Sequence, residues 1–178
     1  IPNPIVTVGT FDGVHIGHRK IIQRLRELAN EQEGESVILT FFPHPRMVLF
    51  PDDHDLKLLS TLDEKVRLLE STGIDHLIIH PFTEKFSRLS STEYVRDMLV
   101  GKLNLHTLVI GYDHHFGRNR EGSFENLQEL ASLYNFQVEE IPAQDLNNIN
   151  ISSTKIRNAL IEGDVSVAQD YLGSPYLL

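Results

Sequence analysis

Two histidines in a glycine-rich segment are the residues of this sequence whose types and spacing best suit chemistry. His15 and His18 lie three positions apart with Gly17 between them. At the start of a helix this spacing lets both imidazoles converge on one small volume, where they can donate hydrogen bonds to phosphoryl oxygens and stabilise charge developing in a transition state. Nearby glycines let the backbone approach a ligand, and free amides at a helix N-terminus bind anions. The segment therefore predicts phosphate chemistry rather than a purely structural turn.

We expect the rest of this segment to bind the same ligand as the two histidines. The residues expected at this phosphate-bearing ligand are Gly9, Thr10, Phe11, Asp12 and Gly17. Zinc is the alternative ligand of the histidines, and catalytic zinc usually takes a third protein ligand, which His114 or His115 would have to supply. No carboxylate–histidine helix motif accompanies them, so we favour phosphate and expect no metal site built by the protein.

A second candidate site lies near the end of the chain. Ser152, Ser153 and Thr154 precede an expected helix, and Lys155 and Arg157 follow in its first turn. Cations at a helix N-terminus oppose the macrodipole, so their placement is unfavourable unless an anion compensates for them. Taken alone, the segment is explained equally well by a simple Ser/Thr cap with solvated charges. Taken with the histidine segment, it is better explained as a clamp for a triphosphate.

Two further loops are open to more than one interpretation. Pro43, His44 and Arg46 follow an expected strand, and the prolines predict an extended loop there. That loop could line a substrate pocket or only form a stiff exit from the sheet. The loop over residues 111–122 combines glycines, aromatic residues and two arginines. Asp113 could accept hydrogen bonds from a ribose hydroxyl, or the whole loop could be a polar surface.

The elements that must position these segments are short apolar runs alternating with helical patterns. The expected strands span residues 5–8, 36–41, 76–79, 107–110 and 136–141. The expected helices span residues 18–31, 61–73, 90–100, 127–134, 153–161 and 164–172. Because the strands are continuous apolar runs separated by helices, we predict an α/β fold, a doubly wound sheet of about five parallel strands with helices on both faces. In such sheets ligands bind at the carboxyl ends of the strands.

Composition limits the class of protein. The 178 residues suffice for one domain, which we expect over residues 1–178. A formal net charge of −9 argues against a partner that is duplex nucleic acid. No apolar run approaches the ~20 residues of a membrane span, so we expect no membrane partner. The absence of cysteine excludes disulfides and thiolate metal sites, and we expect a cytoplasmic protein.

These residues carry a resemblance to a known family. The His-x-Gly-His element of residues 15–18 resembles that of the cytidylyltransferase-like nucleotidyltransferases. With residues 40–45, 111–117 and 151–157, the chain resembles more narrowly the FMN adenylyltransferase module of bacterial bifunctional riboflavin kinase/FAD synthetases. The resemblance covers essentially the whole chain. It implies a Rossmann-like domain that uses ATP with Mg²⁺ to adenylate FMN, giving FAD and pyrophosphate by direct attack of the FMN phosphate on the ATP α-phosphorus.

The resemblance also implies roles for individual residues. His15 and His18 are expected to bind the ATP phosphates. The β- and γ-phosphates are expected to be held by Ser152, Ser153, Thr154 and Arg157. Gly111 and Asp113 are expected at the nucleotide, with Asp113 on the ribose. The flavin is expected to be bordered by Phe42, Pro43, His44 and Arg46. The family usually has phenylalanine where this chain has His114.

Two other functions compete with this one. Another adenylyl- or cytidylyltransferase of the superfamily would share the histidine element, but the segments at residues 43–45 and 113–117 belong to the flavin branch. A non-catalytic flavin- or nucleotide-binding module is disfavoured because both histidines and the whole segment from Ser152 to Arg157 are present.

In the bifunctional enzymes that the chain resembles, a β-barrel riboflavin kinase domain follows the adenylyltransferase module. We therefore expect such a domain in the full-length protein and none within residues 1–178, and we predict that these 178 residues have no riboflavin kinase activity. Incubation with riboflavin and ATP, followed by chromatography of the flavins, measures this. Formation of FMN would contradict the prediction.

Overall fold

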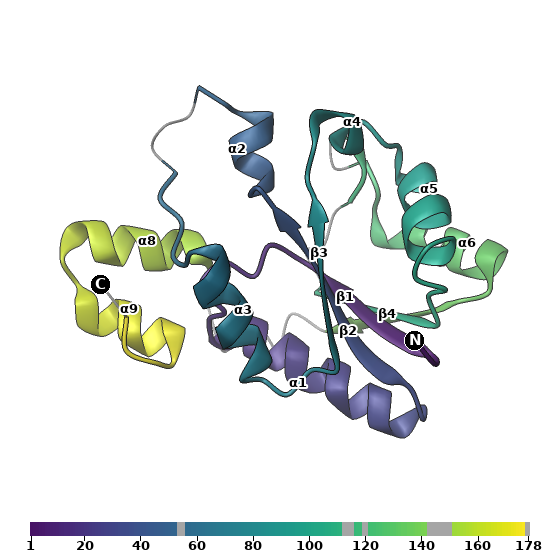
Figure 1. The fold of residues 1–178 in the computed structure, drawn as a ribbon, viewed down its shortest axis with the longest axis horizontal. Helices are drawn as coiled ribbons and strands as arrows, with labels where there is room; N and C mark the ends of the chain where they lie inside the picture. The colour runs from purple at the N-terminus through teal and green to yellow at the C-terminus, as the bar shows by residue number, and fades with distance from the viewer. Residues whose placement is uncertain (53–55, 112–115, 119–120, 142–150, 177–178) are drawn as a thin grey trace.

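A parallel β-sheet runs through the centre of the computed structural model (Figure 1). The structure describes residues 1–178 except 53–55, 112–115, 119–120, 142–150 and 177–178. The five strands have the order β3-β2-β1-β4-β5, and each neighbouring pair is parallel. They are β1 (Pro4–Val8), β2 (Glu35–Phe42), β3 (His76–Pro81), β4 (Thr107–Gly111) and β5 (Gln137–Ile141). This confirms the predicted α/β fold with five parallel strands.

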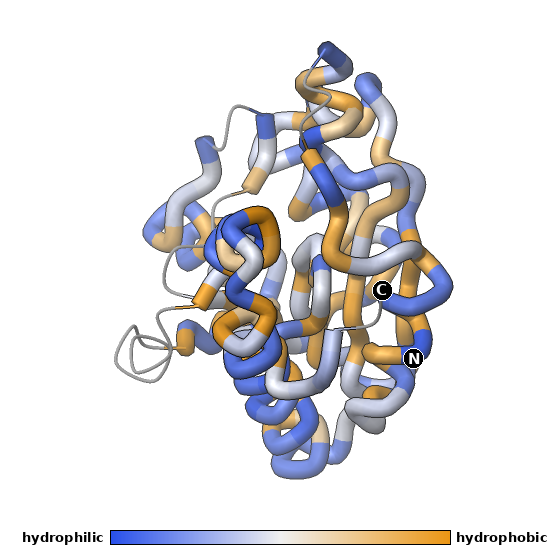
Figure 2. The backbone as a smooth tube through the Cα atoms, turned by 90° about the vertical axis from the view of Figure 1, so that its left-hand side faces the viewer, coloured by the Kyte–Doolittle hydropathy of each residue, from blue (hydrophilic) through white to orange (hydrophobic). Residues whose placement is uncertain are grey.

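Helices cover both faces of the sheet, as predicted. One face carries α1 (Ile16–Glu31) and α3 (Leu62–Glu70), whose buried side chains join a core cluster with strand residues such as Ile5 and Ile38. The other face carries α5 (Ser91–Glu93), its continuation η1 (Tyr94–Val100) and α6 (Phe124–Tyr134), which pack on residues such as Val6 and Val37. Figure 2 shows the hydrophobic stretches along the strands and hydrophilic stretches along the outer helices. Burial on both faces explains why the strands read as continuous apolar runs.

The last two helices form a separate small layer beside the loop that follows β1. Helices α8 (Ser153–Glu162) and α9 (Val165–Leu172) pack against each other and share a cluster with Leu59. A Cβ added at Gly13 would lie 3.2 Å from Leu172, so the end of α9 reaches the loop between β1 and α1. The fold thereby brings the two segments singled out in the sequence close together.

The helix predicted over residues 90–100 is present, but its geometry differs from an α-helix. Ser90 and Glu93 form a capping box at its start, and both of its hydrogen bonds are present. From Tyr94 onward the chain is a π-helix that ends with the amide of Gly101 bonded to the carbonyl of Arg96 at 2.8 Å. The wider turn leaves four side chains buried, namely those of Tyr94, Val95, Met98 and Leu99. Periodicity in the sequence does not distinguish such a turn from an α-helix.

The prolines after β2 predicted an extended loop, and this prediction is wrong beyond His44. The chain forms the short helix α2 (Pro45–Leu49), with Pro45 in its first turn and His44 as its N-cap. Proline suits the first helical position because its missing N–H has no partner there in any case. The Nδ1 atom of His44 accepts a hydrogen bond from the amide of Arg46 at 3.2 Å. A further short helix, α4 (Glu84–Ser87), follows β3.

Candidate functional site

The loop between β1 and α1 holds a strained backbone at the carboxyl edge of the sheet. β1 lies between β2 and β4, where the strand order reverses, and ligands bind at this position in open α/β sheets. Three residues of the loop have positive φ: Phe11 at 49°, Gly13 at 78° and Val14 at 40°. For phenylalanine and valine such angles cost about 1–3 kcal/mol each. Both side chains are buried, at 2% and 0% exposure, and this packing holds the strained loop in place.

The two histidines stack on each other at the start of α1. Their ring centroids are 3.7 Å apart with an interplanar angle of 16°. His15 is the N-cap of the helix, and its Nδ1 atom accepts a hydrogen bond from the amide of His18 at 3.3 Å. A Cβ at Gly17 would lie 3.2 Å from two atoms of the His15 ring, so glycine leaves room for this stack. The predicted convergence of the imidazoles on one small volume is present.

Both imidazoles are held in the uncharged form. Burial lowers the pKa of His15 to about 4, although the carboxylate of Asp12 opposes this. Burial also lowers the pKa of His18 well below its usual value, and the charges of His15 and Lys65 add to this effect. Because Nδ1 of His15 accepts a hydrogen bond, its proton is on Nε2, which is left as a donor. The Nδ1 atom of His18 is itself buried and has no hydrogen-bond partner within the described part of the chain, so a ligand must use Nε2.

A buried carboxylate joins this loop to two other segments. Asp12 is 3% exposed, and its Oδ1 accepts hydrogen bonds from the amides of Leu59 at 2.9 Å and Ser60 at 3.2 Å. Its Oδ2 accepts from Nη2 of Arg157 in an ion pair. Hydrogen bonds that involve charged groups are the strong ones, and here they satisfy a carboxylate that burial would otherwise penalise. Asp12 was predicted at the nucleotide, but the structure occupies its carboxylate with protein donors.

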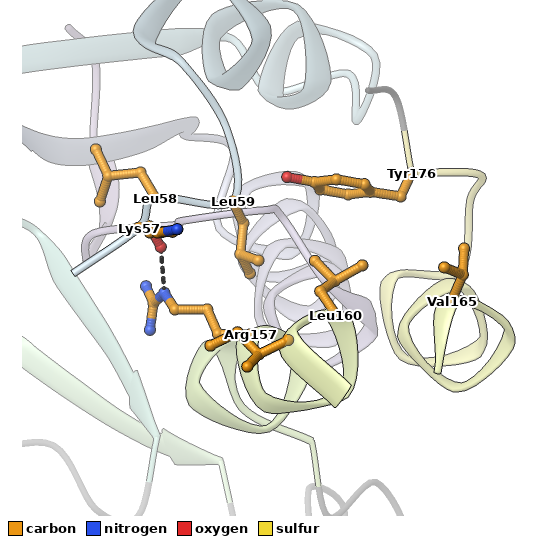
Figure 3. Close-up of a pocket in the computed structure, with 8 residues that line it drawn as sticks. Lys57, Leu58, Leu59, Arg157, Leu160, Val165 and Tyr176 are labelled. Carbon is orange, nitrogen blue, oxygen red and sulfur yellow. Dashed lines mark hydrogen bonds between the residues drawn. The ribbon is translucent and has the colours of Figure 1, made fainter. Parts of the chain in front are cut away.

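The start of α8 lies against the same loop, as the pairing of the two segments in the sequence suggested. The Ser153 hydroxyl donates to the Asp12 carbonyl at 3.0 Å across 141 positions. Ser152 is the N-cap and accepts from the amide of Lys155 at 3.3 Å, and Thr154 is exposed in the first turn. The anion that compensates Arg157 in this turn is Asp12, a partner that the sequence analysis did not foresee. The Nε atom of Arg157 donates to the carbonyl of Lys57 at 2.8 Å (Figure 3).

A buried lysine lies at the same edge of the sheet, and the sequence analysis missed it. Lys65 of α3 is 9% exposed, and its Nζ donates to the carbonyl of Thr10 at 3.2 Å, to Thr40 Oγ1 at 3.4 Å and to the carbonyl of Phe41 at 3.4 Å. In sequence it resembles the solvated charges beside it in a capped helix. The available signal was its spacing of four from Leu69, since both residues are on the buried face of α3.

The segment predicted to border a flavin reaches the same edge through His44. Burial lowers the pKa of His44; Asp12 opposes this, whereas Arg157, Lys65 and Arg46 act in the same direction as burial. These charges place His44 within electrostatic reach of the groups around Asp12. Phe42, at the end of β2, is 48% exposed. Gly111 ends β4, whereas Asp113, His114 and His115 lie outside the described residues.

A largely apolar pocket adjoins the clamp. Its volume is about 350 Å³, and its walls come from residues 57–59, Arg157 and Leu160 of α8, and Tyr176 (Figure 3).

Across the residues that the structure describes, no group of three or more histidine, cysteine or acidic side chains could hold a metal ion. The described helices include none that is long and apolar enough to cross a membrane.

Comparison with known proteins identifies similar chains. A family model described as FAD synthetase matches residues 2–155. A bifunctional riboflavin kinase/FMN adenylyltransferase of Buchnera aphidicola subsp. Schizaphis graminum is 35% identical over 175 residues, covering 98% of this chain and 56% of that protein. The proteins of the same name from Listeria monocytogenes and Escherichia coli K12 are 34% and 33% identical, each over 98% of this chain and 55% of the relative. The chain thus spans a little over half the length of these curated relatives.

A solved structure also resembles the whole chain. It is that of a protein named macrolide-efflux protein from Streptococcus pneumoniae, with a TM-score of 0.85 and 29% sequence identity. The match covers 99% of this chain and 57% of that one.

Substitution of Asp12 by alanine should strongly destabilise the protein. The change leaves the Arg157 guanidinium and two backbone amides without their acceptor, and breaking one partner of a buried ion pair costs about 3–5 kcal/mol. Urea denaturation measures the free energy of unfolding. Asp97→Ala is the matched control, because Asp97 pairs with Arg96 at the surface with side chains 53% and 51% exposed. A loss for Asp12→Ala no larger than that of the control would contradict this account.

The lowered pKa of His15 should make the protein less stable in acid. Its ordinary value is 6.5 and its folded value is about 4, so the unfolded chain binds the proton first. The contribution of His15 to the free energy of unfolding is therefore complete above pH 6.5 and is lost as the pH falls from 6.5 towards 4. His15→Asn retains a good helix cap but has no titrating ring. Denaturation at several pH values should show that the free energy of unfolding depends less steeply on pH in this variant than in the wild-type protein. Equal slopes for the two proteins would count against the lowered pKa.

Proposed function

We propose that this chain, which belongs to the FAD synthetase family, transfers the AMP group of ATP to FMN, giving FAD and pyrophosphate. One observation carries the proposal: a stacked pair of uncharged histidines at the start of α1 is joined, through Asp12, to the hydroxyl-rich start of α8. The relatives are named for two activities, and this chain matches little more than half of their length. We assign the adenylyltransferase activity to this chain and expect a riboflavin kinase domain to accompany it in the full-length protein.

The reaction needs no nucleophile from the protein. An oxygen of the FMN phosphate attacks the α-phosphorus of ATP, the bond from that phosphorus to the bridging oxygen breaks, and pyrophosphate leaves with the electron pair. Catalysis then depends on positioning the two substrates and stabilising the charge that develops on the transferred phosphoryl group. Donors that are fixed in place before the substrate arrives serve this purpose well, because they need no reorganisation during the reaction.

His15 and His18 are proposed to supply such donors. The low pKa of each ring keeps it neutral at physiological pH, so each ring has one N–H group that can donate a hydrogen bond to a phosphoryl oxygen. The start of α1 has no acidic residue in its first turn, so its free amides and its dipole also favour an anion. We therefore place the ATP phosphates over this helix start, against Gly9, Thr10, Phe11 and Gly17.

The start of α8 is proposed to hold the β- and γ-phosphates. Ser152, Ser153 and Thr154 bring three hydroxyls to a helix N-terminus, and Arg157 adds a guanidinium that Asp12 and the Lys57 carbonyl fix in place. Ser153 also donates to the loop of the histidines, so the two halves of the phosphate site form one connected unit. Asp12 itself is a positioning residue in this scheme, because its carboxylate is filled by protein donors.

Magnesium is proposed to accompany ATP. Mg²⁺ usually keeps several waters and is held through substrate phosphates rather than by a protein cage. The one buried carboxylate described at this site, Asp12, is engaged by Arg157 and two amides, which fits an ion carried on the phosphates. When bound it would neutralise phosphate charge.

FMN is proposed to lie at the end of β2 and the start of α2, beside Phe42, Pro43, His44 and Arg46. The ribose of ATP is assigned to Gly111 and Asp113.

Incubation of the protein with ATP, Mg²⁺ and FMN should yield FAD and pyrophosphate. Chromatography with fluorescence detection separates FMN from FAD and gives the rate. Pantetheine phosphate and nicotinamide mononucleotide serve as alternative acceptors. Adenylation of either of these without any reaction of FMN would overturn the flavin assignment and leave a different nucleotidyltransferase of the same superfamily.

Replacement of His18 by alanine should reduce kcat by about 10²-fold or more, because loss of one preorganised donor to a transition state has this effect. The fold should persist, since His18 lies in the first turn of α1 and the residue is partly exposed. His76→Ala is the matched control, because His76 lies at the amino end of β3, whereas the histidine pair lies at the carboxyl ends of the strands. An unchanged rate for His18→Ala would point to a binding module, or to chemistry placed elsewhere in the chain.

A further inference from the structure

One buried charged side chain has no part in the mechanism proposed so far. Lys65 comes from α3, and its ammonium group lies where the loop after β1 meets the carboxyl end of β2. We propose that Lys65 is a positioning residue: its ammonium group pins this loop to the sheet and places a positive charge near His18. The inference rests on the proposed function for its consequence in turnover, but its structural part can be tested without substrates.

The contacts of Lys65 fix the loop from below. Its Nζ bridges the Thr10 carbonyl in the loop and the Phe41 carbonyl at the end of β2. The Thr40 hydroxyl completes the arrangement, because it lies 3.4 Å from Nζ and also donates to the Thr10 carbonyl at 3.2 Å. Thr10 is five residues before His15, so the carbonyl held by Lys65 belongs to the same short loop as the helix cap. Three oxygens on three separate residues thus hold the lysine in a single position.

The charge of Lys65 is only partly compensated. The three oxygens that it contacts are neutral, burial lowers its pKa, and Asp12 is the charged group that opposes this. Asp12 is already paired with Arg157, so one carboxylate faces two cations at this edge of the sheet. An ammonium group buried with incomplete compensation is costly. Binding of a phosphate nearby would offset this cost, because the negative charge of the phosphate compensates the buried ammonium group.

The same charge acts on His18. The ionisable groups whose charges act on His18 are His15 of the helix cap and Lys65 of α3, and both lower its pKa in addition to burial. Those that act on His15 are Asp12, which raises its pKa, and Arg157, which lowers it. Removal of the Lys65 charge therefore leaves burial and His15 to act alone on His18, and its pKa must rise. A purely structural lysine would not have this effect on the histidine.

Two substitutions test the charge, and one keeps it. Lys65→Met removes both the charge and the hydrogen bonds, Lys65→Gln removes the charge but keeps a donor, and Lys65→Arg keeps the charge. Lys102→Met serves as the matched control, because Lys102 is an exposed lysine in the turn after η1. The imidazole of His18 is titrated by NMR in the ligand-free protein, and kcat/KM for FAD formation is measured across the pH range. Circular dichroism verifies that each variant is folded.

The expected results separate charge from packing. Lys65→Met and Lys65→Gln should raise the pKa of His18 and move the acid limb of the pH profile to higher pH. Loss of the contacts that position the loop should also reduce kcat/KM at pH 7 by about tenfold or more. Lys65→Arg should leave the acid limb where the wild-type protein has it, and Lys102→Met should change nothing. If Lys65→Met fails to fold, Lys65→Gln decides alone.

Two failures can be told apart. An unchanged His18 titration in folded Lys65→Met or Lys65→Gln would overturn the inference, even if turnover falls. A wild-type protein that makes no FAD would overturn the proposed function, whereas the NMR titration would still test the role of Lys65.

Discussion

The buried ion pair between Asp12 and Arg157 is the interaction on which the arrangement of the site depends. Asp12 lies in the loop after β1, its amide donors come from residues 59–60 and its guanidinium donor comes from α8. These segments are 47 and 145 positions away in sequence, and the sheet alone does not hold them together. The helices α8 and α9 have only a small apolar cluster of their own. The buried ion pair between Asp12 and Arg157 therefore fixes where α8 and α9 pack against the loop after β1.

Charge is distributed around the loop in a way that suits an anionic ligand. Two cations share one carboxylate, and the nearby imidazoles stay neutral because they are buried. A protein with a formal net charge of −9 thus concentrates positive charge at one edge of its sheet. Water is largely excluded from these groups, so each donor acts in a medium of lower dielectric than the solvent. The strained φ angles of Phe11 and Val14 occur in the same loop, where packing holds the backbone ready for a ligand.

Much of this architecture could be predicted from the sequence, because it depends on periodic patterns. The five strands and the pairing of residues 9–18 with residues 152–157 follow from apolar runs and from residue types that suit phosphate. The partners of individual charges could not be predicted in this way. The sequence analysis expected Asp12 at the ligand without foreseeing the protein donors that its carboxylate accepts, and it did not single out Lys65. Both contacts were missed because burial of a single charge depends on tertiary contacts rather than on local pattern. The same applies to α2, where a proline that suggested an extended chain begins a helix.

The amides of Leu59 and Ser60, which Asp12 binds, lie on the segment that leads from α2 to α3. That segment follows the residues assigned to the flavin, whereas Asp12 belongs to the loop assigned to ATP. The two substrates of the proposed reaction are therefore assigned to parts of the chain that share one buried anchor. Thermodynamic linkage requires that any coupling through such an anchor be reciprocal. If bound ATP raises the affinity for FMN, then bound FMN raises the affinity for ATP by the same factor. The carboxylate that organises the site would then also set how strongly the protein prefers to hold both substrates at once.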